Sequence, residues 1–513
     1  MSLLLPVTEP LSTPQAAHLL RRATFGASSA HIRQFTGLTP GEAVQRLLAD
    51  TPAAPAPLDP ATGQTIMDKA FNRNLSNNLL KGWWLGLMLT EPVSLREKTT
   101  LFWQNHFVST IAEVQDYRFM HRQNVMLRRN AFGNFRTFVM EVTKEPAMLR
   151  YLNGNQNVVG RPNENYAREL LELFTIGRNN YNEDDVKAAA RVLTGWADTG
   201  FRNETTATFG SLYRPNQHDT TGKTFSSFFQ STVIQGRSGD AGGDLELGEL
   251  IDMILRQPET ARNIVRKMYR WFINADLTAE IEKDFIEPLA QVFRQNQYEI
   301  KPVLTALFTS RHFFDTNLKG AIIKSPLELI VGSWRTFGMS VPDYTKETTN
   351  FYALANTLLT RSREQQMDVL DQPTVFGYKP YYDTGYYEIW INSNTLAMRG
   401  GYTDSFINGN IRVSNVRQIP NLLPLVAATS DPADAVKMID ELTGLVLAVD
   451  LSRSQKDFLI DQVLVPGLPR YVWSDEWNNY RNDPTNTVKQ MAVQMKLTSL
   501  MQYVFRMAEF QMT

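Results

Sequence analysis

The chain of 513 residues is 43% hydrophobic and 20% charged, which is the composition of a globular protein with a sizeable core. Its 52 Lys and Arg residues against 53 Asp and Glu residues leave a net charge of −1, so broad binding to nucleic-acid phosphates is excluded. The chain has no cysteine, which excludes disulfides, thiolate metal sites and cysteine nucleophiles.

The first residues of the chain carry no basic segment and only a short apolar run at 3–5. A secretory signal peptide needs both a charged start and a longer apolar stretch, so none is predicted in this chain. A cytoplasmic bacterial protein, export together with a partner and an already processed start all stay open. No apolar run approaches the roughly 18 residues that cross a bilayer, so we expect no membrane span.

Helical periodicity and capping residues recur along the chain, which predicts a mainly α-helical fold, a large multi-helix globular unit. Two stretches rich in Gly, Asn, Ser, Thr and aromatic residues interrupt the pattern, and we expect long irregular excursions there, with room for small β-hairpins. The predicted regions are N-terminal helices and a Pro-rich connector at 1–62, a helical core with a polar helix at 63–197, an irregular region at 198–244, a helical region at 245–370, an aromatic-, Gly- and Asn-rich loop region at 371–431 and a C-terminal helical region at 432–513.

One helix in the first helical block carries an aromatic face with a histidine. Ser94 followed by Glu97 has the spacing of a capping box, which predicts the start of this helix. Phe102, Trp103 and His106 then share a face by i, i+3 and i, i+4 spacing. We therefore expect His106 to point where the aromatic side chains point.

The most polar predicted helix covers residues 163–177. Asn163 can cap its start, and Gly177 predicts its end because glycine adopts the left-handed conformation that closes helices. Its apolar side chains share one stripe, which predicts a buried face: Ala167, Leu170, Leu171 and Phe174. Its other side carries three carboxylates and one guanidinium: Glu164, Arg168, Glu169 and Glu172.

Further short motifs accompany this helix along the chain: Leu-Leu-Arg-Arg-Ala-Thr-Phe-Gly at 19–26, Leu-Phe-Trp-Gln-Asn-His-Phe at 101–107, Asn-Ala-Phe-Gly-Asn-Phe at 130–135, Pro-Ala-Met-Leu at 146–149, Leu-Thr-Gly-Trp at 193–196, His218-Asp219 with Lys223, Ile-Lys-Ser-Pro at 323–326, Trp-Ile-Asn-Ser at 390–393 and Glu-Phe-Gln at 509–511. Together with the polar helix, they make the chain resemble the uncharacterised bacterial domain-of-unknown-function 1800 family over nearly its full length.

The resemblance implies a mostly helical bacterial protein with no established activity. It also implies a partner, because genes of this family commonly lie beside those of a second family that resembles sulfatases and alkaline phosphatases and often carries an export signal. The chain departs from the family at two places. Phe174 stands where the family helix usually has a histidine, and Gly377-Tyr378 stands where the family has a Gly-Trp pair.

One hypothesis for the polar helix is a site for a divalent metal, Zn, Mn or Fe. Carboxylates and imidazoles are suitable ligands for these ions, and Glu169 and Glu172 lie three residues apart on one side of the helix. His106 and His218 would complete the ligand set. A bound ion would activate water or hold a phosphoryl or sulfuryl oxygen.

Two alternatives need no metal. In the first, Arg168 bridges Glu164 and Glu172 in an ordinary ion ladder, each pair contributing about 0.2–0.5 kcal/mol. In the second, the helix carries acid–base chemistry, because Glu164 beside Arg168 would keep a low pKa while burial would raise the pKa of Glu169. The candidate catalytic residues are Glu164, Arg168, Glu169, Asp219 and Lys223.

We predict a polar pocket on the 164–172 helix, closed by His106 and the 218–223 loop, in a protein that acts with a sulfatase- or phosphatase-like partner. The alternative is a non-catalytic binding or assembly subunit. Aromatic residues that crowd one irregular region favour a partner surface, or else pack that region onto the helices: Tyr352, Tyr378, Tyr381, Tyr382, Tyr386, Tyr387 and Trp390.

Overall fold

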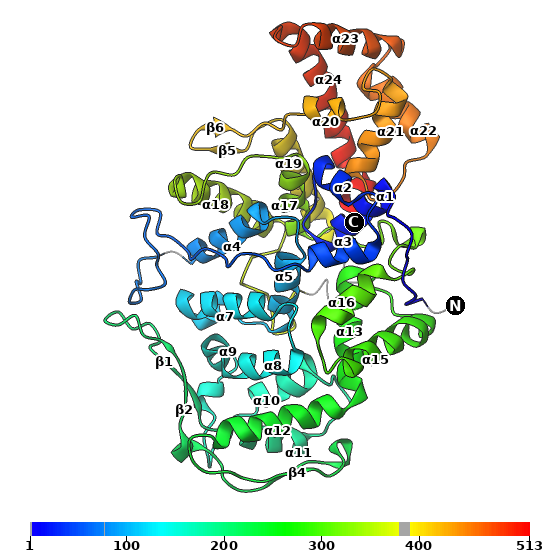
Figure 1. Cartoon of the computed structure of the whole chain (residues 1–513). Coiled ribbons are helices and arrows are strands. Elements are labelled where there is room, and N and C mark those ends of the chain that lie inside the picture. The colour runs from blue at the N-terminus through cyan, green and yellow to red at the C-terminus, as the bar shows by residue number, and fades with distance from the viewer. Residues whose placement is uncertain (1–2, 76, 379–389) are drawn as a thin grey trace.

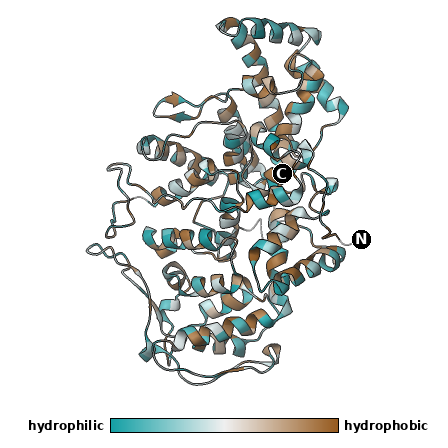
Figure 2. Ribbon diagram, viewed as in Figure 1, coloured by the Kyte–Doolittle hydropathy of each residue, from teal (hydrophilic) through white to brown (hydrophobic). Residues whose placement is uncertain are grey.

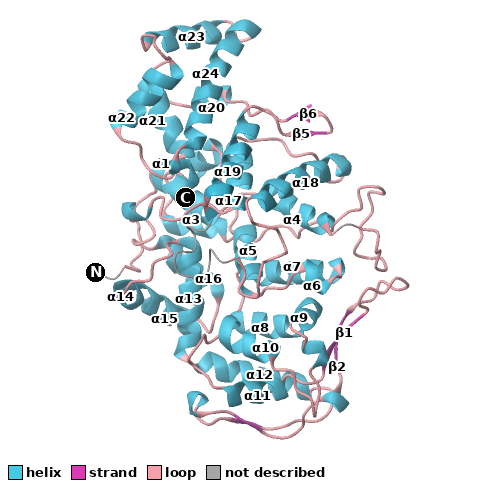
Figure 3. Ribbon diagram, turned by 180° about the vertical axis from the view of Figure 1, so that it is seen from behind, coloured by secondary structure: helices cyan, strands magenta, loops and turns pink. Residues whose placement is uncertain are grey.

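Helices make up most of the computed structural model, which describes residues 3–75, 77–378 and 390–513 (Figure 1). The predicted mainly α-helical fold is confirmed. Strands within these ranges form only small two-stranded antiparallel hairpins, which lie at the periphery when the molecule is seen from behind (Figure 3). No helix in these ranges is both long and apolar enough to cross a membrane.

The first half of the chain, as far as the second hairpin, forms a series of helices followed by two hairpins. The helices are α1 (Thr13–Ala23), α2 (Ser29–Phe35), α3 (Pro40–Leu47), α4 (Asn78–Thr90), α5 (Arg96–His106), α6 (Ile111–Val114), α7 (Tyr117–Asn130), α8 (Phe135–Lys144), α9 (Pro146–Tyr151), α10 (Asn165–Glu169) and α11 (Glu183–Val192). The strands β1 (Trp196–Thr199), β2 (Gly210–Tyr213), β3 (Lys223–Thr224) and β4 (Val233–Ile234) follow.

The second half returns to helices and ends in a group that projects from one end of the molecule (Figure 1). Its elements are α12 (Gly242–Arg256), α13 (Pro258–Phe272), α14 (Ala279–Ile281), α15 (Glu287–Gln295), α16 (Ile300–Thr309), α17 (Pro326–Thr336), α18 (Thr348–Glu364), α19 (Ser393–Ile407), β5 (Arg412–Val413), β6 (Val416–Arg417), α20 (Leu423–Ala427), α21 (Ala435–Val446), α22 (Arg453–Phe458), α23 (Tyr471–Asn482) and α24 (Thr487–Arg506).

Helix α5 is the central helix, and every residue of it is buried. Its charged side chains are therefore satisfied inside the protein, as Lys98 is by an ion pair with Glu328. Glu97, expected in a capping box, instead accepts hydrogen bonds from Trp84 Nε1 at 2.7 Å and Arg128 Nε at 2.6 Å. A buried carboxylate without hydrogen-bond donors costs more free energy than a helix start without a capping box. Glu97 therefore binds Trp84 and Arg128, and the predicted capping box does not form.

Apolar side chains from both ends of the chain belong to one continuous core, which runs from Leu11 to Phe510. Hydrophobic colour gathers on the inward faces of the helices and hydrophilic colour on their outer faces, as amphipathic periodicity requires (Figure 2). The helices that position the candidate site, α5, α10 and α13, all contribute to this core.

The two expected irregular regions differ in outcome. The region 198–244 contains the predicted small hairpins, with β1 paired to β2 from Trp196 opposite Tyr213 to Thr199 opposite Gly210. The region 371–431 also contains two helices that the sequence reasoning missed, the short α20 and the longer α19. Asn392 and Thr395 form a capping box at its start, and burial of its Tyr402 and Phe406 side chains offsets the low helix propensity of two internal glycines.

The aromatic cluster is only partly described by the structure. Tyr352, Tyr378 and Trp390 are all less than 4% exposed, so they pack the region onto the helices and offer no partner surface. The other tyrosines of the cluster lie outside the described residues: Tyr381, Tyr382, Tyr386 and Tyr387.

Candidate functional site

The polar helix is shorter than its sequence pattern suggests and changes its winding part of the way along. Asn163 Oδ1 accepts the N–H of Asn165 at 3.0 Å, α10 follows, and Leu170–Phe174 form a π-helical turn. Gly177 has a φ of 84°, so the predicted left-handed end is confirmed. The predicted apolar stripe is confirmed too, since all four of its side chains are fully buried. Single π-turns within helices often occur at functional sites.

The end of this π-turn is held by side chains from two other helices. The carbonyl oxygens of residues 173–175 accept hydrogen bonds from Lys267 Nζ at 2.6 Å, His106 Nε2 at 3.1 Å and Asn263 Nδ2 at 2.7 Å, in that order along the chain. Carbonyls at the end of a helix lack partners within the helix and carry partial negative charge. They therefore fix one imidazole from α5 and one cation from α13 in the same place.

A cavity of about 660 Å³, which we call the α13 pocket, opens beside this junction. Four cations line it against one carboxylate: Arg178, Arg266, Lys267, Arg270 and Glu172. Its other polar and apolar walls come from Asn105, His106, Asn263, Leu277, Val375 and Phe376. Its volume lies in the range of about 300–1,000 Å³ that is usual for small-ligand sites.

Two of the four cations are neutralised by carboxylates. Arg178 Nε lies 2.5 Å from Glu172 Oε1, and Arg266 is paired with both Glu259 and Glu282. Arg270 differs, because its Nε is buried and has no hydrogen-bond partner within the described parts of the chain. Burial lowers the pKa of Arg270, and the positive charge of Arg266 acts in the same direction.

Lys267 and His106 form the most perturbed pair of the pocket. Burial, with help from the Arg270 charge, lowers the pKa of Lys267 to about 7. Burial, and then the Lys267 charge, holds the pKa of His106 well below its usual range, so its ring is neutral at pH 7. Because His106 Nε2 donates to the Phe174 carbonyl, Nδ1 is left as an acceptor, and it lies 3.4 Å from Lys267 Nζ.

Two carboxylates of the polar helix lie in different places: Glu164 is at the surface, and Glu172 lines the α13 pocket. Arg168 pairs with Glu164 at 3.3 Å, as expected, but its second partner is Glu183 at 2.7 Å. The expected Arg168–Glu172 pair is not among those formed, because Glu172 binds Arg178 and accepts from Tyr181 instead. The π-turn rotates residue 172 away from the ladder that an uninterrupted α-helix would present.

Glu169 has no salt bridge or hydrogen bond to any described residue, and it is partly buried. Burial raises the pKa of Glu169 to about 7, with the Glu172 charge adding to the shift and Arg168 opposing it. This is the direction expected from its place between the apolar stripe and the charged face. Glu169 also interacts electrostatically with Lys267, so the two groups with pKa values near 7 belong to the same region.

The 218–223 loop does not line the α13 pocket. His218 Nε2 lies 2.9 Å from Glu246 Oε1, and Lys223 forms an ion pair with the same carboxylate; the three side chains are fully buried and form what we call the His218 cluster. Asp219 pairs with Arg191 at 2.7 Å. Burial opposes it, but hydrogen bonds from Arg191 and Thr221 hold the pKa of Asp219 well below its usual range.

The predicted metal ligands are therefore not collected at one point. His106 and Glu172 line the α13 pocket, whereas His218 faces Glu246 in the His218 cluster. Within the described residues, no group of three or more His, Asp or Glu side chains is placed to hold a metal ion. The ligand set His106, Glu169, Glu172 and His218 thus does not fit a Zn, Mn or Fe site.

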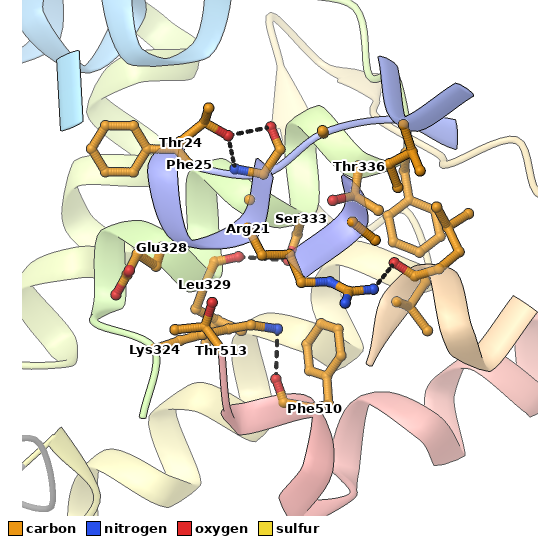
Figure 4. Close-up of a pocket in the computed structure, with 18 residues that line it drawn as sticks. Arg21, Thr24, Phe25, Lys324, Glu328, Leu329, Ser333, Thr336, Phe510 and Thr513 are labelled. Carbon is orange, nitrogen blue, oxygen red and sulfur yellow. Dashed lines mark hydrogen bonds between the residues drawn. The ribbon is translucent and has the colours of Figure 1, made fainter. Parts of the chain in front are cut away.

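A second, much smaller cavity lies where α1, α17 and the end of the chain meet (Figure 4). Its volume is about 40 Å³, room for about one water molecule. Lys324 donates to the Phe510 carbonyl at 2.7 Å across its wall, and burial lowers the pKa of Lys324 to about 7. The space is too small for a substrate, so we regard this cavity as part of the core.

Sequence reasoning missed the cations of α13 altogether. Arg262, Arg266 and Arg270 recur every four residues, with Lys267 beside them, which places a cationic stripe on one face of that helix. The stripe is visible in the sequence, but its meeting with α5 and the π-turn is not.

A family model described as "Protein of unknown function (DUF1800)" matches residues 18–512, so the chain belongs to that family. No curated protein matches the chain, and no solved structure matches it.

Proposed function

We propose that this DUF1800 protein binds a small anionic ligand in the α13 pocket. The observation that carries the proposal is Arg270, whose buried Nε points to a missing acceptor at the wall of a ligand-sized cavity. A guanidinium presents paired N–H donors that match the oxygens of a carboxylate, phosphate or sulfate group. Arg178 and Arg266 are paired with carboxylates, so the positive potential that such a group needs comes mainly from Arg270, and from Lys267 when it is protonated.

Lys267 supports binding and also offers proton transfer. With a pKa near 7 it gains or loses a proton close to neutral pH, which is where a general acid or base works best. The neutral His106 ring fixes its position through Nδ1 at 3.4 Å, and the residue-173 carbonyl does so at 2.6 Å. Whether the pocket only binds its ligand or also transforms it depends on this lysine.

A sulfatase- or phosphatase-like partner fits the same ligand chemistry. Such a partner acts on sulfate or phosphate esters, so its substrates and products carry the oxyanion that the α13 pocket would bind. The proposed function therefore includes a sulfatase- or phosphatase-like partner, as the family resemblance implies.

The test is calorimetric titration of the purified chain with inorganic phosphate, sulfate and acetate at low ionic strength. We expect Arg270→Gln to weaken binding of the preferred anion at least tenfold, about 1.4 kcal/mol. Arg262→Gln is the matched control, because Arg262 lies two turns earlier on α13, pairs with Glu287 at 2.5 Å and does not line the pocket. Absence of binding by all three anions, or equal binding by Arg270→Gln, would refute the proposal.

An assembly role is the second candidate, and one surface feature favours it. Val488, Met491 and Met495 form an exposed apolar stripe on α24, each more than 60% exposed. The stripe lies on the helical group that projects from the body, where a second copy of the chain can reach it (Figure 1). A net charge of −1 offers little repulsion between copies, so we take self-association as the form of this role.

Self-association is tested by light scattering of the full chain over a range of concentrations. We expect a concentration-dependent dimer that Met491→Lys abolishes, with Gln490→Lys, on an exposed neighbouring position, as the control. A monomer at every concentration would contradict the assembly role and leave the anion proposal untouched.

A further inference from the structure

A third cavity lies on the other side of the helical core from α13 and shares no lining residue with the α13 pocket. We call it the β1 hollow. It has a volume of about 700 Å³ and lies between α7, α8, the β1–β2 hairpin and the start of α12. Two sequence motifs that the anion proposal does not use lie next to it: Glu145 directly precedes the motif at 146–149, and Trp196 ends the motif at 193–196.

Glu145 gives the hollow a buried acceptor. Its side chain is only 4% exposed, and Oε1 has no hydrogen-bond partner among the described residues. Arg122 Nε lies 3.4 Å away, which is an ion pair but long for a hydrogen bond. Burial raises the pKa of Glu145 to about 7 in spite of Arg122. A buried carboxyl oxygen whose only neighbouring donor is this long ion pair is incompletely satisfied, so a ligand hydroxyl that donates to it would be favourable.

Trp196 gives the hollow a buried donor. It is 7% exposed, and its Nε1 has no acceptor among the described residues. The ring is held in place by the Tyr213 ring at 5.1 Å and by Lys144, whose Nζ lies 5.3 Å from the ring centroid. Since a buried indole N–H normally has a partner, an acceptor is missing here.

The charges that line the β1 hollow cancel. Three cations face three carboxylates in three pairs, Arg122 with Glu145 at 3.4 Å, Arg129 with Glu141 at 2.6 Å and Lys144 with Asp244 at 2.7 Å. With every lining Arg and Lys paired to a carboxylate, the hollow has little net charge with which to select an ion, and protonation of Glu145 changes that charge by no more than one unit. In this it differs from the α13 pocket, where Arg270 forms no ion pair with any described carboxylate.

We propose that the β1 hollow binds a neutral, hydroxyl-rich ligand of the size of a mono- or disaccharide. A hydroxyl group both donates and accepts, so neighbouring hydroxyls of one sugar can donate to Glu145 Oε1 and accept from Trp196 Nε1. Val125, Met126 and Phe209 supply the apolar wall against which the C–H faces of a sugar ring pack. The assignment is independent of the anion proposal, because the two cavities share no lining residue and one takes a neutral ligand while the other takes an anion.

The test uses glucose, N-acetylglucosamine and maltose as neutral probes, with glucose 6-phosphate as the charged one, in calorimetric titrations of the full chain. We expect at least one neutral sugar to bind with a dissociation constant below about 10 mM, and inorganic phosphate not to compete with it. Glu145→Gln and Trp196→Phe each remove one hydrogen-bonding group and nearly keep the shape, so each should weaken binding about tenfold, or about 1.4 kcal/mol.

Trp477→Phe is the control, because Trp477 is also buried but lies on α23 at the far end of the molecule (Figure 1). Thermal unfolding of each variant shows whether it is folded, and Glu145→Gln still decides the matter if Trp196→Phe is not. Failure of every neutral probe to bind, or unchanged binding in the folded variants, would overturn the assignment. Because its phosphate can also bind in the α13 pocket, glucose 6-phosphate is titrated into the Arg270→Gln variant, and tighter binding of it than of glucose there would overturn the choice of a neutral ligand.

Discussion

The α13 pocket and the His218 cluster both bring ionisable side chains together beneath an apolar surface, and they differ in how those groups are satisfied. In the His218 cluster, Glu246 accepts from His218, Lys223 and the Arg237 N–H, and the three side chains are fully buried. In the α13 pocket, Arg270 Nε lacks a partner within the described residues and a cavity lies next to it.

The difference shows that a buried charge does not by itself mark a functional site. The His218–Glu246–Lys223 cluster ties the 218–223 loop to α12, because each of its three buried side chains bonds to another of them or to the surrounding backbone. A buried polar group without a hydrogen-bond partner lowers the stability of the folded protein. Where such a group lies beside a cavity, a ligand that supplies the missing partner can remove this cost, so the group indicates a binding site. The predictions below separate these two roles.

The largest effect is expected at Glu246. Glu246→Gln removes the negative charge and leaves Lys223 buried without a carboxylate, which should lower the free energy of unfolding by about 3–5 kcal/mol. Chemical denaturation measures the loss, and anion binding to the remaining folded protein should be unchanged. Glu249→Gln, an exposed pair on the same helix, is the control. A loss below about 1 kcal/mol would show that the cluster is not a structural clamp.

A smaller effect, which depends on pH, is expected at Lys267. Its pKa is about 7 in the folded chain against an ordinary 10.5, so the unfolded chain binds more protons between these values. The free energy of unfolding should therefore rise with pH, by about 2–3 kcal/mol between pH 7 and 9, compared with Lys267→Met. Below pH 7 the difference between the two proteins should become constant.

Urea denaturation at a series of pH values tests this expectation for Lys267. Parallel pH profiles for the native chain and Lys267→Met would mean that the lysine is not forced to change its protonation on folding. Its assignment as a proton donor or acceptor in the pocket would then fail, while anion binding through Arg270 would remain to be judged by titration.

The smallest effect is expected at Arg168, on the outer face of the polar helix. About a third of its side chain is exposed, and its partners Glu164 and Glu183 are more exposed still. Solvent screens such pairs, so Arg168→Gln should change stability by less than about 1 kcal/mol and leave anion affinity unaltered. A loss of anion affinity in this variant would move the site from the α13 pocket to the outer face of the helix.

Local patterns in the sequence determined much of the polar helix. The buried stripe of Ala167, Leu170, Leu171 and Phe174 follows from helical spacing, and the left-handed Gly177 follows from the lack of a Cβ. The ring of His106 lies 6.3 Å from that of Phe102 and 5.5 Å from that of Trp103, as their spacing on one helix predicts. These features depend on contacts within a few residues, which a sequence displays directly.

Tertiary structure alone decided which charged groups meet. His106 and Lys267 are 161 residues apart in the chain, and they come together because carbonyl groups at the end of a π-turn accept hydrogen bonds from both. At the same turn, Glu172 pairs with Arg178 and not, as expected, with Arg168. The partner of His218 is Glu246 and not a carboxylate of the polar helix. Long-range pairing depends on how whole helices pack against one another, and the spacing of residues within each helix carries no record of it.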